Sequence, residues 1–303
     1  MAGFTDRRVT VSVPATSANL GPGFDCLGLA LDLRDELAGE VVDTGLAVEV
    51  AGEGAGELPD DETHLVVRAM RTAFEALDAA PPGLRLRCTN RIPHSRGLGS
   101  SSAAIVGGLV LARALVRDGA ERLDDAALLT LANRLEGHPD NVAPALLGGL
   151  VVCGQEAGDD GSTRVWAQPA RVRETIRAVV FVPPAGVLTE VARGLLPDQV
   201  SHHDAVANTA RAALLVTALD RAPHLLPAAT EDFLHQRYRR PAMPETLALV
   251  ERLRAEGFAA VVSGAGPTVL VLTDEDVADL DHRVPDGWSC HRLAVDHAGA
   301  RVR

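Results

Sequence analysis

The sequence contains no lysine, and all 29 basic residues among its 303 are arginines. This absence excludes lysine-dependent phosphate-binding loops, sites of the protein-kinase type and enzymes that form a Schiff base, since each needs an ε-amine. The arginines are outnumbered by 41 acidic residues, which gives a formal net charge of −12. A dedicated nucleic-acid binder is therefore not expected, because neutralising phosphates requires clustered positive charge.

Aromatic side chains are also scarce, at 3% of the chain, whereas 47% of the residues are hydrophobic. The core must therefore be built mainly from alanine, valine and leucine, and few rings are present on which bases could stack. No apolar run approaches the ~18 residues that a membrane span requires, and no apolar stretch of a secretory signal follows the charged N-terminus. We expect a globular cytoplasmic protein that binds neither nucleic acid nor membrane.

The four cysteines lie far apart in the sequence. No pair has the C-x-x-C spacing that is typical of a zinc site or a redox dithiol. We therefore expect all four to be buried, reduced thiols. They are Cys26, Cys88, Cys153 and Cys290.

Two stretches rich in glycine and acidic residues interrupt the chain, at 52–62 and 154–163. The first predicts a surface loop between a strand that ends near Val50 and a helix over 63–77. The second lies near mid-chain and predicts a domain boundary. A long hairpin loop inside one sheet would give the same pattern. The predicted domains cover residues 1–160 and 161–303.

Hydrophobic periodicity predicts strands and helices along both halves of the chain. The helix over 125–136 has the clearest ends, with Asp124 near its N-cap and Gly137 just past its last residue. Because strands and helices are interleaved throughout, the predicted fold class is α+β in two layers. The predicted strands cover 9–13, 46–50, 84–88, 176–182, 258–262 and 269–272, and the other predicted helices cover 102–117, 204–219 and 244–256.

The strongest local motif is a run of glycines and serines over 93–104, directly before an apolar helix. Glycines allow backbone N–H groups to approach a ligand, serines offer hydroxyl groups, and the helix N-terminus adds partial positive charge. Such a loop can bind an anion without a lysine. A glycine turn followed by an ordinary serine N-cap is the alternative, but the complete string G-L-G-S-S-S-A-A favours the anion site.

A second polar motif, over 14–25, follows the first predicted strand and contains two hydroxyls, an amide and a carboxylate. A glycine-rich loop of this kind can direct such groups at a small polar ligand, and Asp25 could bind an ammonium group. The residues could equally form a polar turn in which Ser17, Asn19 and Asp25 only satisfy the local backbone.

A third motif covers 136–144, at the end of the helix over 125–136. Glu136, His138 and Asn141 bring a carboxylate, an imidazole and an amide within six positions, a set suited to Mg²⁺, a phosphate and a hydroxyl group. On spacing alone, a glycine C-cap followed by an Asp/Asn turn is the better interpretation.

A fourth motif is the glycine-rich turn over 263–268, between two β-rich runs, for which a plain hairpin loop is the simplest interpretation. Two arginines in the same half of the chain could clamp a carboxylate. These are Arg193, which follows Thr189, and Arg239. In a chain with 29 arginines, this choice has little weight by itself.

Taken in order, the four motifs resemble those of the GHMP small-molecule kinases, from about Val9 to Leu272. The string T-S-A-N-L-G-P-G-F-D most resembles the members that act on L-homoserine. The resemblance implies ATP-dependent phosphorylation of the homoserine hydroxyl to O-phospho-L-homoserine, on the route to threonine. It also implies an N-terminal α+β domain with a left-handed β-α-β unit that binds ATP and a ferredoxin-like C-terminal domain. Homodimers are common in this family.

The resemblance also assigns roles to individual residues. Ser101 would lie near Mg²⁺, with Glu136 as a second candidate ligand. His138 and Asn141 match the family's substrate-site pair and are the candidate catalytic residues. The third glycine motif of the family corresponds to Gly264 and Gly266. The ATP-binding set comprises Pro93, His94, Ser95, Arg96, Gly97, Leu98, Gly99, Ser100, Ser101, Ser102 and Ala103, and the substrate-binding set comprises Asn19, Asp25, His138, Asn141, Thr189, Arg193 and Arg239.

The reaction expected from this resemblance is a direct in-line transfer. Asn141 would orient the hydroxyl rather than deprotonate it, since an amide cannot accept a proton at neutral pH. Many family members have Asn-Leu where this chain has His64-Leu65. The alternatives are a related kinase for mevalonate, shikimate or a threonine-like amino acid, and a non-catalytic nucleotide-binding module. Asp25 favours the amino acid, because mevalonate has no ammonium group for it to bind.

Overall fold

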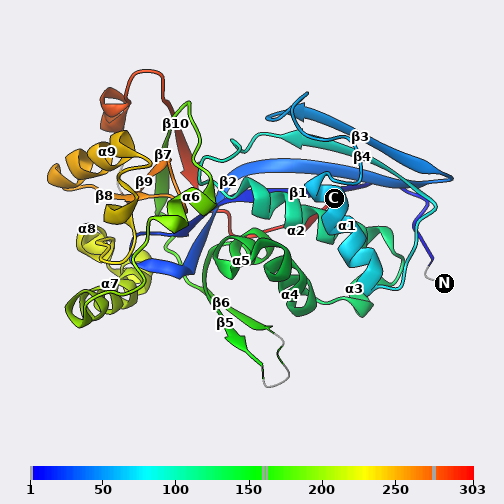
Figure 1. Cartoon of the computed structure of the whole chain (residues 1–303), viewed down its shortest axis with the longest axis horizontal. Coiled ribbons are helices and arrows are strands. Elements are labelled where there is room, and N and C mark those ends of the chain that lie inside the picture. The colour runs from blue at the N-terminus through cyan, green and yellow to red at the C-terminus, as the bar shows by residue number, and fades with distance from the viewer. Residues whose placement is uncertain (1–2, 159–160, 162, 275–277) are drawn as a thin grey trace.

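A long antiparallel hairpin of two strands extends from the C-terminal half to the far end of the N-terminal half (Figure 1). The computed structural model describes residues 3–158, 161, 163–274 and 278–303. The first strand was predicted to end at residue 13, but it continues through the second motif, because Thr16 and Ser17 are fully buried and their backbone groups must be paired. The two strands are β1 (Val9–Asn19) and β2 (Gly23–Val42).

This hairpin lies in a seven-stranded sheet with the order β11-β1-β2-β4-β3, to which β5 and β6 are added through β2. The stretch over 154–163 joins β5 to β6 within this sheet, as in the hairpin alternative, and residues 159, 160 and 162 lie outside the described residues. The strands predicted at 46–50 and 84–88 are confirmed. The remaining strands are β3 (Gly45–Gly52), β4 (Gly83–Asn90), β5 (Leu150–Ala157), β6 (Thr163–Ala170) and β11 (Arg301–Val302).

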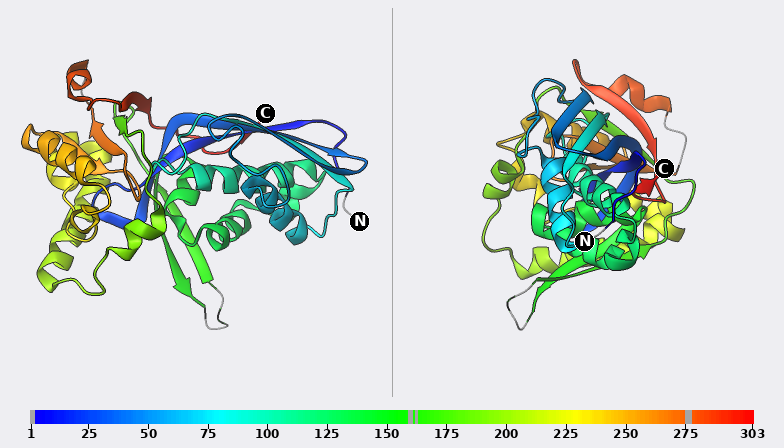
Figure 2. Two further views of the ribbon diagram at one scale, coloured as in Figure 1. Left: turned by 45° about the horizontal axis from the view of Figure 1, so that its top comes forward. Right: turned by 90° about the vertical axis from the view of Figure 1, so that its right-hand side faces the viewer.

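The helices of the first half pack on one side of this sheet (Figure 2). The predicted caps of the helix over 125–136 are confirmed, since Asp124 accepts a hydrogen bond from the Ala127 N–H and Gly137 has a left-handed conformation. The next segment was predicted as an Asp/Asn turn after the glycine C-cap, but it is a helix, which begins with Pro139 at a position where a missing backbone N–H costs little. The five helices are α1 (Leu65–Ala76), α2 (Ser100–Leu115), α3 (Gly119–Arg122), α4 (Asp125–Glu136) and α5 (Pro139–Leu147).

The second half contains a four-stranded antiparallel sheet with the order β10-β7-β9-β8. Its two faces bury alternate residues, so that Val180 joins the core of the N-terminal half while Val179 and Phe181 face a second core beneath α9. The predictions missed α6, α8, β6, β10 and β11 in this half of the chain, and β2, β5 and α3 in the first half. The elements are β7 (Arg177–Val182), β8 (Ala259–Val262), β9 (Val269–Thr273), β10 (Ser289–Ala294), α6 (Thr189–Gly194), α7 (His202–Arg221), α8 (Leu226–Ala229), α9 (Pro244–Ala255) and the 3₁₀ turns η1 (Pro223–Leu225), η2 (Gln236–Arg239) and η3 (Ala278–Arg283).

All four cysteines are free thiols. Cys88 and Cys153 are buried as predicted, whereas Cys26 and Cys290 are only half-buried. Burial raises the pKa of Cys88 to about 12, which keeps this thiol protonated at neutral pH. Within the described part of the chain, no helix is long and apolar enough to cross a membrane.

Candidate active site

The glycine-serine loop between β4 and α2 is held by close backbone contacts. Ser95, Gly97 and Gly99 all have positive φ angles. A Cβ atom on Gly97 would lie 2.3 Å from the Ser263 carbonyl oxygen, and one on Gly99 would lie 1.9 Å from the Thr16 hydroxyl oxygen. Only glycine fits these two positions. The loop leads into the N-terminus of the sixteen-residue helix α2, where backbone N–H groups can bind an anion.

Side chains tie this loop to the C-terminal half of the chain. The Arg96 guanidinium donates to the carbonyl oxygens of His94, Pro183 and Pro184, so it holds the loop in place instead of pointing at a ligand. The Ser263 hydroxyl donates to the Gly97 carbonyl oxygen over 2.6 Å. These contacts preorganise the backbone donors that the loop offers to a ligand.

The loop borders a cavity of about 200 Å³, to which all four sequence motifs contribute. Asp25 lies outside it and lines a neighbouring cavity of about 710 Å³. Pro93, Arg96, Leu98 and Ser102 line neither of these cavities. The predicted residues that line the first cavity are Asn19, Ser95, Gly97, Gly99, Ser100, Ser101, Glu136, His138, Asn141, Thr189, Arg193, Arg239, Gly264 and Gly266.

The structure brings the two candidate metal ligands together. The Glu136 carboxylate, at the end of α4, accepts hydrogen bonds from the hydroxyls of Ser101 and Ser102, each over 2.8 Å. A carboxylate beside a hydroxyl is a hard oxygen donor set, which fits Mg²⁺. No group of three or more His, Cys, Asp or Glu side chains arranged for a metal occurs among the described residues. An ion here would therefore depend on further oxygens, such as those of phosphates and water.

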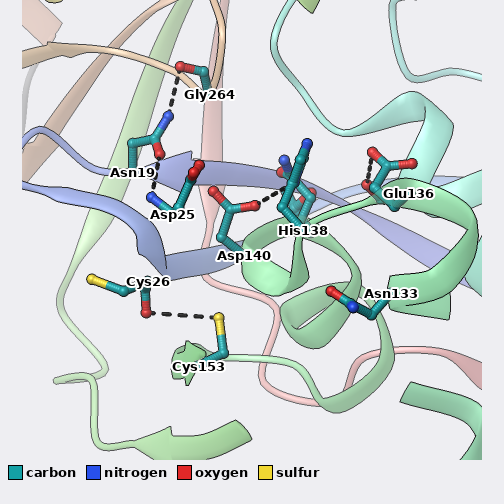
Figure 3. A network of polar contacts seen from close by, with 12 residues as sticks. Asn19, Asp25, Cys26, Asn133, Glu136, His138, Asp140, Cys153 and Gly264 are labelled. Atoms are coloured by element: carbon teal, nitrogen blue, oxygen red, sulfur yellow. Dashed lines mark hydrogen bonds and ion pairs between the residues drawn. The ribbon is translucent and has the colours of Figure 1, made fainter. Parts of the chain in front are cut away.

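The N-terminus of α5 presents His138 and Asn141 to the cavity. His138 Nδ1 lies 2.7 Å from the carboxylate of Asp140, which is 2% exposed (Figure 3). Burial lowers the pKa of His138, but the hydrogen bond and charge of Asp140, with the charge of Glu136, outweigh burial and raise it. Asn141 Oδ1 accepts a hydrogen bond from the Thr16 hydroxyl over 2.8 Å, which leaves the Asn141 NH₂ group as the donor.

Sequence reasoning missed the roles of Thr16 and Asp140. Both belong to the quoted motifs, and a carboxylate two residues after His138 was a signal that could have revealed the pair. The contact between Thr16 and Asn141 joins residues 125 positions apart, so no local pattern indicated it.

Asp25 and Arg193 form a bidentate ion pair, with nitrogen–oxygen distances of 2.6 and 3.0 Å. Asn19 supports this pair, because its side chain accepts from the Asp25 backbone N–H and donates to the Gly264 carbonyl oxygen (Figure 3). Asn19 and Asp25 both have positive φ angles, a conformation that Asn and Asp tolerate better than most residues. The motif therefore fixes the direction of the Asp25 carboxylate.

Arg239, in η2, is a buried cation without an anion partner. Its side chain donates to the Gly264 carbonyl oxygen over 2.8 Å, while its Nε atom is buried with no hydrogen-bond partner. Burial and the charge of Arg193 lower its pKa to about 10. No carboxylate among the described residues lies within ion-pair distance of it. The cavity therefore contains a guanidinium that an anionic ligand would stabilise.

A third cavity of about 290 Å³ adjoins the same loop and shares Ser95, Ser100 and Ser101 with the first. Its wall is largely apolar and includes Leu58 and His64. His64 caps α1 by accepting the Val66 N–H at Nδ1, while its buried Nε2 atom has no partner. His94 and Ala103 of the predicted ATP-binding set also line this cavity.

Two family models match the chain. The first, described as the GHMP kinases N terminal domain, covers residues 64–149, and the second, the GHMP kinases C terminal, covers residues 210–284. With the glycine-serine loop and the two-part fold, these matches define a small-molecule kinase of the GHMP class and confirm the predicted fold class.

Relatives that align with the full chain show which family within this class the protein belongs to. The homoserine kinase of Streptomyces avermitilis is 58% identical over 305 residues, which cover 100% of this chain and 98% of that protein. The homoserine kinase of Clavibacter michiganensis is 52% identical over 99% of this chain and 95% of that protein. The chain belongs to the homoserine kinase family and is a phosphotransferase.

Solved structures agree with this assignment. The homoserine kinase of Cytophaga hutchinsonii superimposes with a TM-score of 0.80 at 25% identity, covering 100% of this chain and 99% of that one. Mevalonate diphosphate decarboxylase of Staphylococcus aureus gives a TM-score of 0.70 at 13% identity, covering 98% of both chains. The second match shows the shared fold alone.

Proposed function

We propose that the protein transfers the γ-phosphoryl group of ATP to the side-chain hydroxyl of L-homoserine, giving O-phospho-L-homoserine for threonine biosynthesis. The observation that carries this proposal is the presence of opposite charges in two adjoining cavities. Arg239 is a buried guanidinium with no anion partner among the described residues, and Asp25 is a carboxylate in the neighbouring cavity. A free amino acid supplies the carboxylate and the ammonium group that these residues can bind.

In this proposal the substrate carboxylate binds Arg239 and Arg193, and Thr189 contributes its hydroxyl. The ammonium group binds Asp25, whose direction Asn19 fixes through the Asp25 N–H. Mevalonate has no ammonium group, so Asp25 would have no group of that acceptor to bind. The bidentate ion pair holds the Arg193 guanidinium beside the Asp25 carboxylate, which supports binding of a ligand whose own opposite charges lie close together.

The ATP phosphates bind the backbone donors of the loop over 93–103 and the N-terminus of α2. The base enters the apolar cavity beside His64, which adjoins the loop through Ser95 and Ser100. Ser101 and Glu136 would hold Mg²⁺, an ion that neutralises developing phosphate charge in kinases. Since the chain has no lysine, this neutralisation must come from the metal, from arginine and from backbone dipoles.

The substrate hydroxyl lies against Asn141 at the other end of the cavity. Thr16 occupies Asn141 Oδ1, so the Asn141 NH₂ group donates to the hydroxyl oxygen and aligns it with the phosphorus. His138, held by Asp140, adds a cationic donor near the transferred group when protonated. No residue is required as a strong base, because phosphoryl transfer depends mainly on positioning and charge stabilisation.

A coupled assay of ADP release tests the proposal with purified protein, ATP and Mg²⁺. The acceptors are L-homoserine, L-threonine, L-serine, shikimate and mevalonate. We expect selective turnover of L-homoserine. Turnover of shikimate or mevalonate would refute the roles of Asp25 and Arg239, and ATP binding without turnover of any acceptor would indicate a nucleotide-binding module.

A further inference from the structure

The aromatic ring of Phe24 contacts both arginines of the candidate substrate site. The guanidinium carbon of Arg193 is 5.5 Å from the centre of the ring, and that of Arg239 is 5.7 Å away. Both distances are within the range of a cation–π interaction. Phe24 itself lines neither the cavity beside Arg239 nor the one beside Asp25, so it can act on a ligand only through its neighbours.

The Phe24 ring stacks on a buried histidine. His235 is 0% exposed and stacks on Phe24, with ring centres 5.1 Å apart and planes inclined by 28°. His235 is fixed in turn, since its Nε2 lies 2.8 Å from the Gly21 carbonyl oxygen and its backbone N–H donates to Asp232. Phe24 therefore has a rigid support on the side of His235.

Two positive charges that approach each other repel, and although Arg193 is paired with Asp25, no carboxylate among the described residues lies within ion-pair distance of Arg239. The negative face of an aromatic ring attracts both cations without neutralising either. A carboxylate side chain in the same place would bind them and remove their attraction for a ligand. Phe24 thus holds the two guanidinium groups near each other and leaves Arg239 available to an anion.

We propose that Phe24 is a positioning residue that, through its contacts with Arg193 and Arg239, sets the affinity for the carboxylate of the amino-acid substrate. This inference rests on the proposed function, in which the two arginines bind that carboxylate. It predicts that removing the ring weakens binding of a carboxylate-bearing acceptor while the transfer step and the nucleotide site keep their properties.

The test compares Phe24→Leu with a matched control, Phe258→Leu. Phe258 also lies beneath an arginine, with the Arg283 guanidinium carbon 5.3 Å from its ring centre, but outside the cavities described above. For Phe24→Leu we expect KM for L-homoserine to rise about tenfold, which lies between the sizes of an exposed and a desolvated cation–π contact, with kcat changed by less than about twofold. For Phe258→Leu both constants should stay at the wild-type values.

A second acceptor separates this role from a general loosening of the site. Aminopropanol is homoserine without its carboxylate, so its turnover does not depend on the arginines. Phe24→Leu should lower kcat/KM for L-homoserine about tenfold and leave that for aminopropanol unchanged. An equal loss for both acceptors, or a fall in kcat alone, would overturn the inference.

Two ring variants keep the test decisive if Phe24→Leu fails to fold. Phe24→Tyr keeps the ring and should keep the wild-type KM. Pentafluorophenylalanine at position 24 keeps the shape but inverts the charge of the ring face, and should raise KM as leucine does. A wild-type KM with the fluorinated ring would refute the role of the cation–π contacts. Absence of L-homoserine turnover by the wild-type enzyme would instead refute the proposed function itself.

Discussion

Replacing Arg239 with methionine should stabilise the protein while it abolishes tight binding of the amino-acid substrate. The guanidinium is 1% exposed and has no anion partner among the described residues. Methionine keeps an unbranched stem like that of arginine, carries no charge and ends before the position of the guanidinium nitrogens. The Gly264 carbonyl oxygen would stay satisfied, since Asn19 also donates to it. The substitution therefore removes a buried charge and leaves no new unpaired group.

The magnitude follows from the pKa of Arg239, which is lowered from 12.5 to about 10. A shift of this size corresponds to roughly 3 kcal/mol against the charged form in the folded state. The group is protonated in both folded and unfolded chains at pH 7, so the whole penalty is present there and is relieved only as the pH rises through about 10. Losing the bond to Gly264 and the contact with the Phe24 ring offsets about 1 kcal/mol each, which leaves a gain of about 1 kcal/mol.

Urea unfolding at pH 7 measures this gain, and steady-state kinetics measure the loss of function. We expect KM for L-homoserine to rise about 100-fold, the size of one charge-assisted hydrogen bond to a carboxylate. Arg240→Met is the matched control, because Arg240 is the exposed neighbour of Arg239 and pairs with Glu251. This substitution should change the free energy of unfolding by less than about 0.5 kcal/mol. Destabilisation of Arg239→Met by about 3 kcal/mol or more would refute the reasoning, since that is the cost of breaking a buried ion pair.

Three further predictions concern groups around the same cavity. Asn141→Ala should lower kcat about 100-fold and raise KM less, and the opposite pattern would assign Asn141 to ground-state binding. Glu136→Gln should raise the free Mg²⁺ needed for half-maximal activity about tenfold at fixed ATP, and an unchanged requirement would exclude it as a ligand. The raised pKa of His138 contributes stability that is complete below its ordinary value of 6.5 and is lost as the pH rises through the raised value. Asp140→Asn should remove most of this pH-dependent loss of stability, and urea unfolding at several pH values measures the difference from wild type.

The parts of the fold that sequence predicted are those with a local signal. The helix over 125–136 has its own caps, and the strands near 46–50 and 84–88 alternate clearly. By contrast β2, with 20 residues, was missed, because its leucine- and acid-rich segment has the composition of a helix. Pairing with β1, β4 and β5 overrides that local preference.

In the candidate site, too, features with a local sequence signal could be predicted and features formed by distant residues could not. The glycine-serine loop could be recognised because its chemistry is contained in one continuous segment. The pairing of Asp25 with Arg193 joins residues 168 positions apart, and nothing near either residue indicates it. The hydrogen bonds from Arg96 to three backbone carbonyl oxygens could not be predicted either, since no residue type indicates where a backbone acceptor will lie. The boundary at residue 160 stays a prediction.

The pairing of β11 with β1 has a consequence for how the chain is made. Val302 lies opposite Val11, and the Arg303 N–H donates to the Thr10 carbonyl oxygen. During synthesis β1 leaves the ribosome well before β11, so the outer edge of β1 stays open until β11 has been translated. Contacts over such a separation form slowly, and an open strand edge favours aggregation. Each newly made chain therefore passes through a period, from the synthesis of β1 to that of β11, in which this strand edge is vulnerable.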